Sequence, residues 1–99
     1  MTRSLLERRL VDVADRLKRL RAEAGVAEEQ LAFVEDEAED ARLRALVSET
    51  PLADAEARET RRHADALARH RDALRRSIAE LEREQDALLD RMASELPSR

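Results

Sequence analysis

The chain has 99 residues, of which 42% are charged and 42% hydrophobic, and its formal net charge is −4. It contains one aromatic residue, Phe33, one glycine, Gly25, and no cysteine. This composition is typical of long helices and coiled coils, and it excludes disulfides and thiolate metal sites. The negative charge argues against a general binder of polyanions.

No apolar run approaches the roughly 20 residues that span a bilayer. The N-terminal segment lacks the apolar core of a secretory signal. We therefore expect no membrane association, a cytoplasmic location and one domain over residues 1–99.

Apolar residues recur at alternating spacings of four and three from Leu6 to Ala45. This is the heptad pattern, and it predicts a helix over about residues 3–48. Gly25 lies inside the pattern at an outward position, and the phase is the same on both sides of it. We therefore expect a continuous helix in which Gly25 costs about 1 kcal/mol relative to alanine. The alternative is a break at Gly25, which would give three helices.

The segment "SETPLAD" separates this pattern from a second one. Thr50 is a good N-cap residue and Pro51 suits the first position of a helix, so the chain is expected to reverse over a tip at residues 48–53. The same spacing then continues from Ala53 to Met92 and predicts a helix over about residues 51–95.

The predicted fold is all-α, a long antiparallel two-helix coiled-coil hairpin that can dimerise into a four-helix bundle. Pairing residues whose numbers sum to 98 places Leu17 opposite Leu81 and Val34 opposite Ala64. A slip of one heptad would leave Leu6 without a partner, so this register is preferred. The resulting seam between the helices is rich in leucine near the chain ends and in alanine near the tip.

Two polar residues, Arg71 and Gln85, fall at seam positions. Arg71 lies opposite the small Ala27, so its stem has room to direct the guanidinium outward toward Glu28. We interpret both polar residues as fixing the register at some cost in stability. A buried arginine with a functional role is the alternative for Arg71.

Charges are expected to select this orientation. Residues 28–40 contain seven acids and no base, and in the preferred register they face residues 58–70. Because the arginine-rich stretch at residues 60–76 then faces acids and has no aromatic residue nearby, nucleic acid is not an expected partner. The predicted ion pairs include Glu35 with Arg61, Arg42 with Asp54, Arg44 with Glu56 and Arg16 with Glu84.

No residue pattern predicts a metal site, a cofactor site or catalysis. His63 and His70 are seven residues apart, which separates them by about 10 Å on one helix face. The chain has no HExxH motif, no cysteine–histidine cluster and no glycine-rich phosphate loop. We therefore expect the protein not to be an enzyme.

Several large apolar residues lie outside the seam. Leu5, Val26, Phe33 and Val47 share one outer heptad position of the first helix. They are either scattered surface residues or a second, weaker seam that binds another helical protein or a second copy. We favour the second interpretation because a lone hairpin with an alanine-rich half has a thin core.

Residues Thr50 to Met92 resemble short coiled-coil proteins of GC-rich bacteria, a likeness that implies a bacterial origin and no activity. The segment "TPLADAEAR" is similar to the tip of DksA/TraR-type factors. That resemblance implies insertion into the secondary channel of RNA polymerase, with Asp54 and Glu56 as the tip acids. The chain departs from those factors because it has no cysteines for their zinc finger.

The function expected from the sequence is therefore that of a non-enzymatic interaction or scaffold protein that binds itself or a helical partner. The alternative is a transcription regulator that binds RNA polymerase through its acidic tip.

Overall fold

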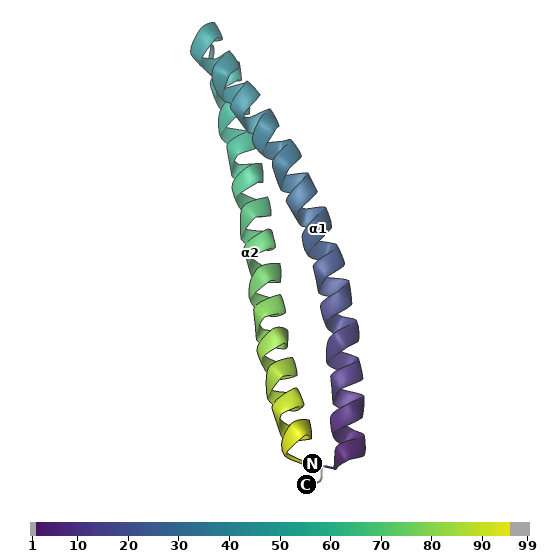
Figure 1. Ribbon diagram of the computed structural model, residues 1–99. Coiled ribbons are helices and arrows are strands. Elements are labelled where there is room, and N and C mark those ends of the chain that lie inside the picture. Colours follow the sequence, from purple (N-terminus) through teal and green to yellow (C-terminus); the bar gives the residue numbers. More distant parts are fainter. Residues whose placement is uncertain (1, 96–99) are drawn as a thin grey trace. The chain divides into compact units, whose positions relative to one another are not determined.

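The computed structural model describes residues 2–95, and these residues form a helical hairpin (Figure 1). Helix α1 spans Arg3–Ser48 and helix α2 spans Pro51–Ser94. The described residues contain no strand. The predicted all-α fold is confirmed, and the observed helix limits differ from the predicted ones by a single residue, at the end of α2.

Threonine side chains cap the start of both helices. The hydroxyl oxygen of Thr2 accepts a hydrogen bond from the backbone N–H of Leu5, and that of Thr50 accepts one from Ala53, each at 3.2 Å. Such caps satisfy backbone donors that have no partner within the helix. Pro51 follows as the first residue of α2, as its fixed φ favours.

The connection between the helices uses an uncommon backbone conformation at Glu49. Its φ is 52°, in the left-handed region, and its N–H donates to the carbonyl oxygen of Ala45 at 3.1 Å. Glycine normally occupies this position after a helix because a side chain is disfavoured there. The tight reversal therefore occurs at a residue whose type does not favour it.

Gly25 does not interrupt α1, so the three-helix alternative is wrong. Its φ is not positive. A Cβ atom added at this glycine would have no neighbour within 4 Å. Its conformation and surroundings therefore do not require glycine.

The described chain divides into two compact units. We call residues 2–23 with 74–95 the leucine unit, and residues 24–73 the alanine unit. Each unit contains a segment of α1 and a segment of α2, and the alanine unit includes the connection between the helices.

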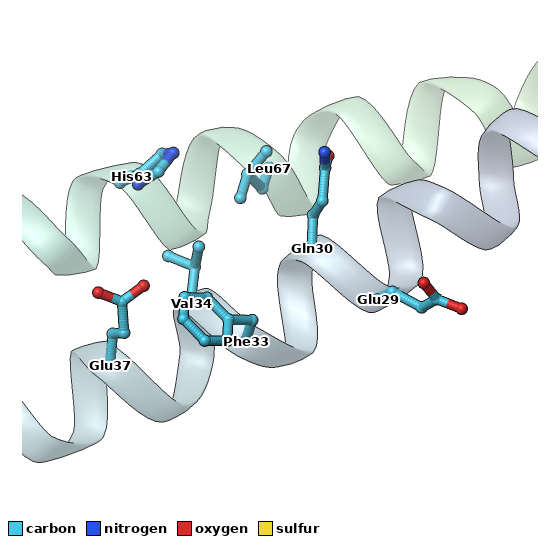
Figure 2. A pocket seen from close by; sticks show the side chains of 7 residues that line it. All are labelled: Glu29, Gln30, Phe33, Val34, Glu37, His63 and Leu67. Carbon is cyan, nitrogen blue, oxygen red and sulfur yellow. The ribbon is translucent and has the colours of Figure 1, made fainter.

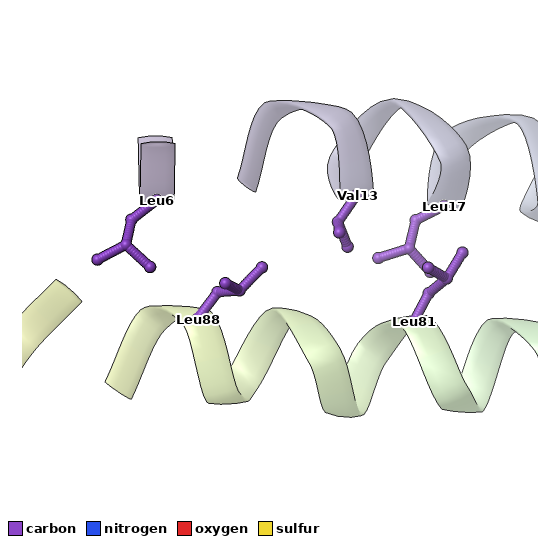
Figure 3. Close-up of a cluster of buried hydrophobic side chains, with 5 residues drawn as sticks. All are labelled: Leu6, Val13, Leu17, Leu81 and Leu88. Carbon is purple, nitrogen blue, oxygen red and sulfur yellow. The ribbon is translucent and has the colours of Figure 1, made fainter. Parts of the chain in front are cut away.

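The leucine unit has a continuous apolar core. Figure 3 shows its buried side chains pointing toward one another from the two helices. Leu6 and Val13 are completely buried, and four partly buried apolar residues pack against this cluster. At about 0.8 kcal/mol for each buried methylene, these large side chains supply most of the unit's apolar stabilisation. The five residues drawn are Leu6, Val13, Leu17, Leu81 and Leu88.

The alanine unit has a thinner core. Val34, Ala38 and Ala64 are buried together, with Leu67 packed against them. Ala27, Leu31 and Ala41 add further buried positions along α1, but alanine contributes only one methyl group each. Every predicted seam position in the described chain is nonetheless buried or half-buried, which confirms the heptad assignment in both helices.

Candidate interaction surface

The alanine unit contains a shallow groove of about 670 Å³ beside the seam (Figure 2). Val34 and Leu67 supply seam side chains from the two helices, and Phe33 adds an exposed ring at the α1 side. The remaining lining is polar and includes Glu37 on α1 and His63 on α2. The full lining is Glu29, Gln30, Phe33, Val34, Glu37, His63 and Leu67.

Phe33 is exposed because of its heptad position. The next residue, Val34, points into the seam and is 7% exposed, whereas Phe33 is rotated by about 100° away from it and is 67% exposed. An aromatic side chain can bury 150–250 Å² when a partner covers it. The only aromatic ring of the chain is thus placed where a second protein could cover it.

The other predicted partner-binding residues are also on the surface. Val26 lies two helical turns before Phe33 in the alanine unit and is exposed, and Val47 is 86% exposed next to the connection. Leu5 is exposed as well, but it belongs to the leucine unit, where it lines a separate hollow with Arg8, Arg9 and Asp12.

A second exposed apolar cluster lies at the tip. Leu43, Leu46 and Val47 occupy neighbouring positions on one side of α1 because they are three and four residues apart. Leu52 in the first turn of α2 is 76% exposed. Heptad position grouped Val47 with Phe33 and did not identify this cluster. Four large apolar residues within ten positions were the signal that could have identified the cluster.

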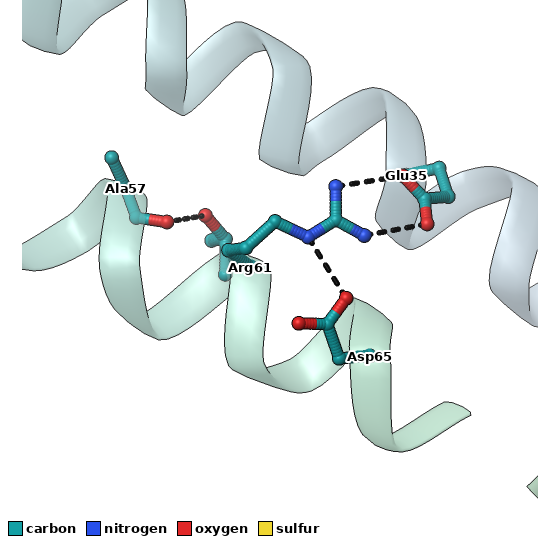
Figure 4. Close-up of polar contacts among 5 residues, drawn as sticks. Glu35, Ala57, Arg61 and Asp65 are labelled. Carbon is teal, nitrogen blue, oxygen red and sulfur yellow. Dashed lines mark hydrogen bonds and ion pairs between the residues drawn. The ribbon is translucent and has the colours of Figure 1, made fainter. Parts of the chain in front are cut away.

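Ion pairs join the helices on the side of the alanine unit away from Phe33. Arg61 on α2 donates to both carboxylate oxygens of Glu35 on α1, at 2.6 and 3.0 Å, and to Asp65 on its own helix at 3.1 Å (Figure 4). The hydrogen bonds from Arg61 lower the pKa of Glu35 below its ordinary value of 4.5. The predicted pair of Glu35 with Arg61 is confirmed.

The other three predicted ion pairs, Arg42 with Asp54, Arg44 with Glu56 and Arg16 with Glu84, do not form among the described residues. Arg42 pairs with Glu39 one turn earlier on α1, at 2.7 Å, and not with Asp54. Glu84 pairs with Arg9, whose Nε lies 2.7 Å from the carboxylate, and not with Arg16. Exposed arginines have several acids within reach at similar energy, so heptad geometry does not select among them.

The groove side carries charges without ion-pair partners. Among the residues that the structure describes, Glu29, Glu37 and His63 take part in no ion pair. The two sides of the alanine unit therefore differ. On the side away from Phe33, the Glu35–Arg61 contact links the two helices. On the groove side, apolar side chains are exposed beside charges that have no ion pair.

The polar seam residues are half-buried. The side chain of Arg71 is 24% exposed, and its guanidinium lies 3.0 Å from Asp72 and 4.0 Å from Glu28. It thus extends toward Glu28, as predicted, and gives no sign of a buried functional arginine. Gln85 is half-buried in the leucine unit.

The tip acids of the alternative interpretation point in different directions. Asp54 and Glu56 are both exposed in the first turns of α2. Residues two apart on a helix are rotated by about 200° relative to each other. The two carboxylates therefore do not form one acidic patch.

Within residues 2–95, no group of three or more His, Asp or Glu side chains is arranged to hold a metal ion. No described helix is both long and apolar enough to cross a membrane. The described residues include no buried charged or polar residue. The features that remain as functional candidates are the groove around Phe33, the apolar tip and the exposed charges.

Comparisons of the chain with protein-family models, with curated proteins and with solved structures gave no match.

Proposed function

We propose that the protein is a non-enzymatic, cytoplasmic interaction protein that uses its hairpin to bind a helical surface, on a second copy or on another protein. The exposure of Phe33 beside the groove carries this proposal. Two packed helices leave this ring in water, and the groove beside it has the shape that receives side chains from another helix. The thin core of the alanine unit supports the same conclusion because a bound helix would add apolar burial there.

A photoreactive benzoylphenylalanine at position 33, incorporated in the native cell, tests the proposal. Ala32 is the matched control because it is also exposed but faces the other side of α1. Irradiation should yield a protein adduct from position 33 and much less from position 32. Absence of any adduct from position 33 would overturn the proposed function.

Regulation of RNA polymerase through the tip is the second candidate. It is supported by the exposure of Asp54 and Glu56 beside the turn and weakened by their divergent directions. If it is correct, Asp54→Ala with Glu56→Ala should abolish an effect of the protein on transcription in vitro while leaving its helical content unchanged. Wild-type protein that neither binds the polymerase nor changes its output would exclude this role.

A further inference from the structure

Arginines recur at every seventh residue along the outward face of α2, at Arg62, Arg69, Arg76 and Arg83. All four are exposed, and none has an ion-pair partner among the described residues. Seven residues are almost two full helical turns, so the members of the series share one side of the helix. Arg62 and Arg69 belong to the alanine unit.

The outward face of α1 carries acids at the same positions along the helix axis as Arg62 and Arg69 of α2. Glu29 and Asp36 are seven residues apart, exposed and without ion pairs. Packing of Val34 with Ala64, and the Glu35–Arg61 ion pair, set the register of the alanine unit. In that register Asp36 is level with Arg62 and Glu29 is level with Arg69.

These charges cannot meet within one chain. The outward faces of two packed helices point in opposite directions, so Asp36 and Arg62 lie on opposite sides of the alanine unit. They would approach each other if α1 of one molecule packed against α2 of another. Charge complementarity at matched heights thus identifies a second copy of this chain as the partner.

We propose that two copies dock through their Phe33 grooves with the tips at the same end. In this arrangement α1 of each copy packs antiparallel to α2 of the other. The inference rests on the proposed function and deepens it, because it names the partner and the orientation.

The apolar side chains are complementary in the same arrangement. Phe33 comes level with Ala66 of the second copy and Val26 with Ala73, and both alanines are exposed in the single chain. A large residue thus meets a small one at both heights, as close packing between helices requires. At the tip, Val47 comes level with Leu52 of the second copy, which would cover two of the most exposed apolar side chains.

The charges also exclude the reverse orientation. If the copies docked with their tips at opposite ends, α1 would pack on α1, and Glu29 and Asp36 would approach the same acids of the second copy. Like charges facing each other across an interface are unfavourable by several kcal/mol. The parallel orientation also brings Asp40 level with Glu59 of the second copy, a like-charged contact that opposes docking.

The groove side of the alanine unit is large enough for a dimer interface. Twenty-five residues of helix are roughly 38 Å long, and two helices about 10 Å apart present a face roughly 20 Å wide. The product is close to the roughly 800 Å² that each partner buries in a specific complex. The alanine unit therefore offers enough surface without any contribution from the leucine unit.

Reciprocal charge reversal tests the arrangement. The first variant carries Glu29→Arg and Asp36→Arg, and the second carries Arg62→Glu and Arg69→Glu. Because these residues take part in no ion pair within residues 2–95, both variants should retain wild-type helical content. In each homodimer, like charges would face each other, so we expect dimer dissociation constants at least about tenfold above that of wild type.

The mixture of the two variants is the decisive sample. In the mixed dimer both α1–α2 contacts recover opposite charges, so sedimentation velocity should show dimers in the mixture at a concentration where each variant alone is monomeric. Glu59→Lys should tighten the wild-type dimer because it removes the like-charged contact with Asp40. Paramagnetic labels at Ser48→Cys should lie close together, since the chain has no other cysteine and the tips share one end.

Three outcomes would overturn the dimer. They are a wild type that sediments as a monomer up to millimolar concentration, a mixture that does not restore association, and tip labels that lie far apart. A monomer that still forms an adduct from position 33 with a different protein would exclude the dimer and leave the proposed function standing. A monomer that binds duplex DNA and loses that binding with Arg62→Glu and Arg69→Glu would replace the dimer with a nucleic-acid partner.

Discussion

Arg61 on α2 holds the carboxylate of Glu35 on α1 with two hydrogen bonds, Nη2 to Oε1 at 2.6 Å and Nη1 to Oε2 at 3.0 Å. This bidentate contact links the helices on the side of the alanine unit away from Phe33. Bidentate arginine–carboxylate pairs fix orientation better than single contacts do. Both side chains are nevertheless about half exposed, so the contact serves orientation more than stability.

The pair makes stability depend on pH. Because hydrogen bonding to Arg61 lowers the pKa of Glu35 in the folded protein, the charged carboxylate favours folding. This contribution is fully present above the ordinary pKa of 4.5 and is lost as the pH falls through the lower folded pKa. Glu35→Gln should therefore reduce the free energy of unfolding at pH 7, and this reduction should shrink as the pH falls below 4.5.

Urea unfolding of wild type and Glu35→Gln at a series of pH values measures this difference. Glu29→Gln is the matched control because Glu29 has no ion pair in the described chain and should show no comparable pH-dependent loss. A Glu35→Gln effect of equal size at pH 7 and pH 3 would show that the Arg61 contact does not favour folding. These measurements should be made at protein concentrations where association is negligible.

Gly25→Ala should stabilise the protein by about 0.5–1 kcal/mol. The added methyl group meets no atom within 4 Å, and alanine loses less conformational freedom than glycine on folding. Thermal and urea unfolding monitored by circular dichroism would measure the gain. A destabilised variant would mean that α1 needs a distortion at this residue.

Glu49→Gly should stabilise the connection by about 0.5–1 kcal/mol, because glycine tolerates the left-handed conformation at φ 52° without a steric cost. Thr50→Ala should have the opposite effect, of about 1 kcal/mol, because it removes the cap at the start of α2. The two variants together test the geometry of the turn by urea unfolding. Equal stability of wild type and both variants would indicate a different turn.

Arg71→Leu should raise the free energy of unfolding of the monomer by about 1 kcal/mol. The arginine occupies a seam position with a half-buried side chain, and the side chains of its neighbours Glu28 and Asp72 are 42% and 47% exposed. Replacing such a residue by leucine adds apolar burial while losing weak ion pairs. Urea unfolding with Arg69→Leu as the exposed control separates burial in the seam from a general effect of removing charge.

Amide hydrogen exchange should reveal the difference between the two units. Local opening depends on local burial, and the leucine unit buries large side chains where the alanine unit buries mostly alanine. We expect the amides of residues 38–60 to exchange faster than those of residues 6–20 and 78–92. Uniform protection along both helices would contradict this expectation.

The helices were predictable because one pattern specifies them throughout. The spacing from Leu6 to Ala45 continues unchanged past Gly25, and burial follows that spacing. The start of α2 was predictable because Thr50 is a favourable cap and Pro51 a favourable first residue of a helix. The left-handed conformation of Glu49 was not predictable, because the residue types that favour it, glycine and asparagine, are absent from this position.

The candidate surface was only partly predictable. The exposure of Phe33 follows from its heptad position, but the groove beside it depends on how the side chains of Val34 and Leu67 fill the seam. The partner of Arg42 was not predictable from heptad position, because Arg42 pairs with Glu39 on its own helix and not with an acid of α2. Heptad position thus determines which side of a helix a residue occupies. The contacts of long exposed side chains depend on their conformations, which the heptad pattern does not specify.

The arrangement of the two cores also bears on how the chain folds. Contacts between the helices beside the connection, where Ala41 is buried, close the shortest loops and so cost the least chain entropy. The large side chains that contribute most burial, including Leu6 and Leu88, are separated by most of the chain. The contacts that form most readily are therefore those that add least stability. Folding should begin near Glu49 with a nucleus of low stability, and unfolding should be slowed mainly by the leucines near the two ends of the sequence.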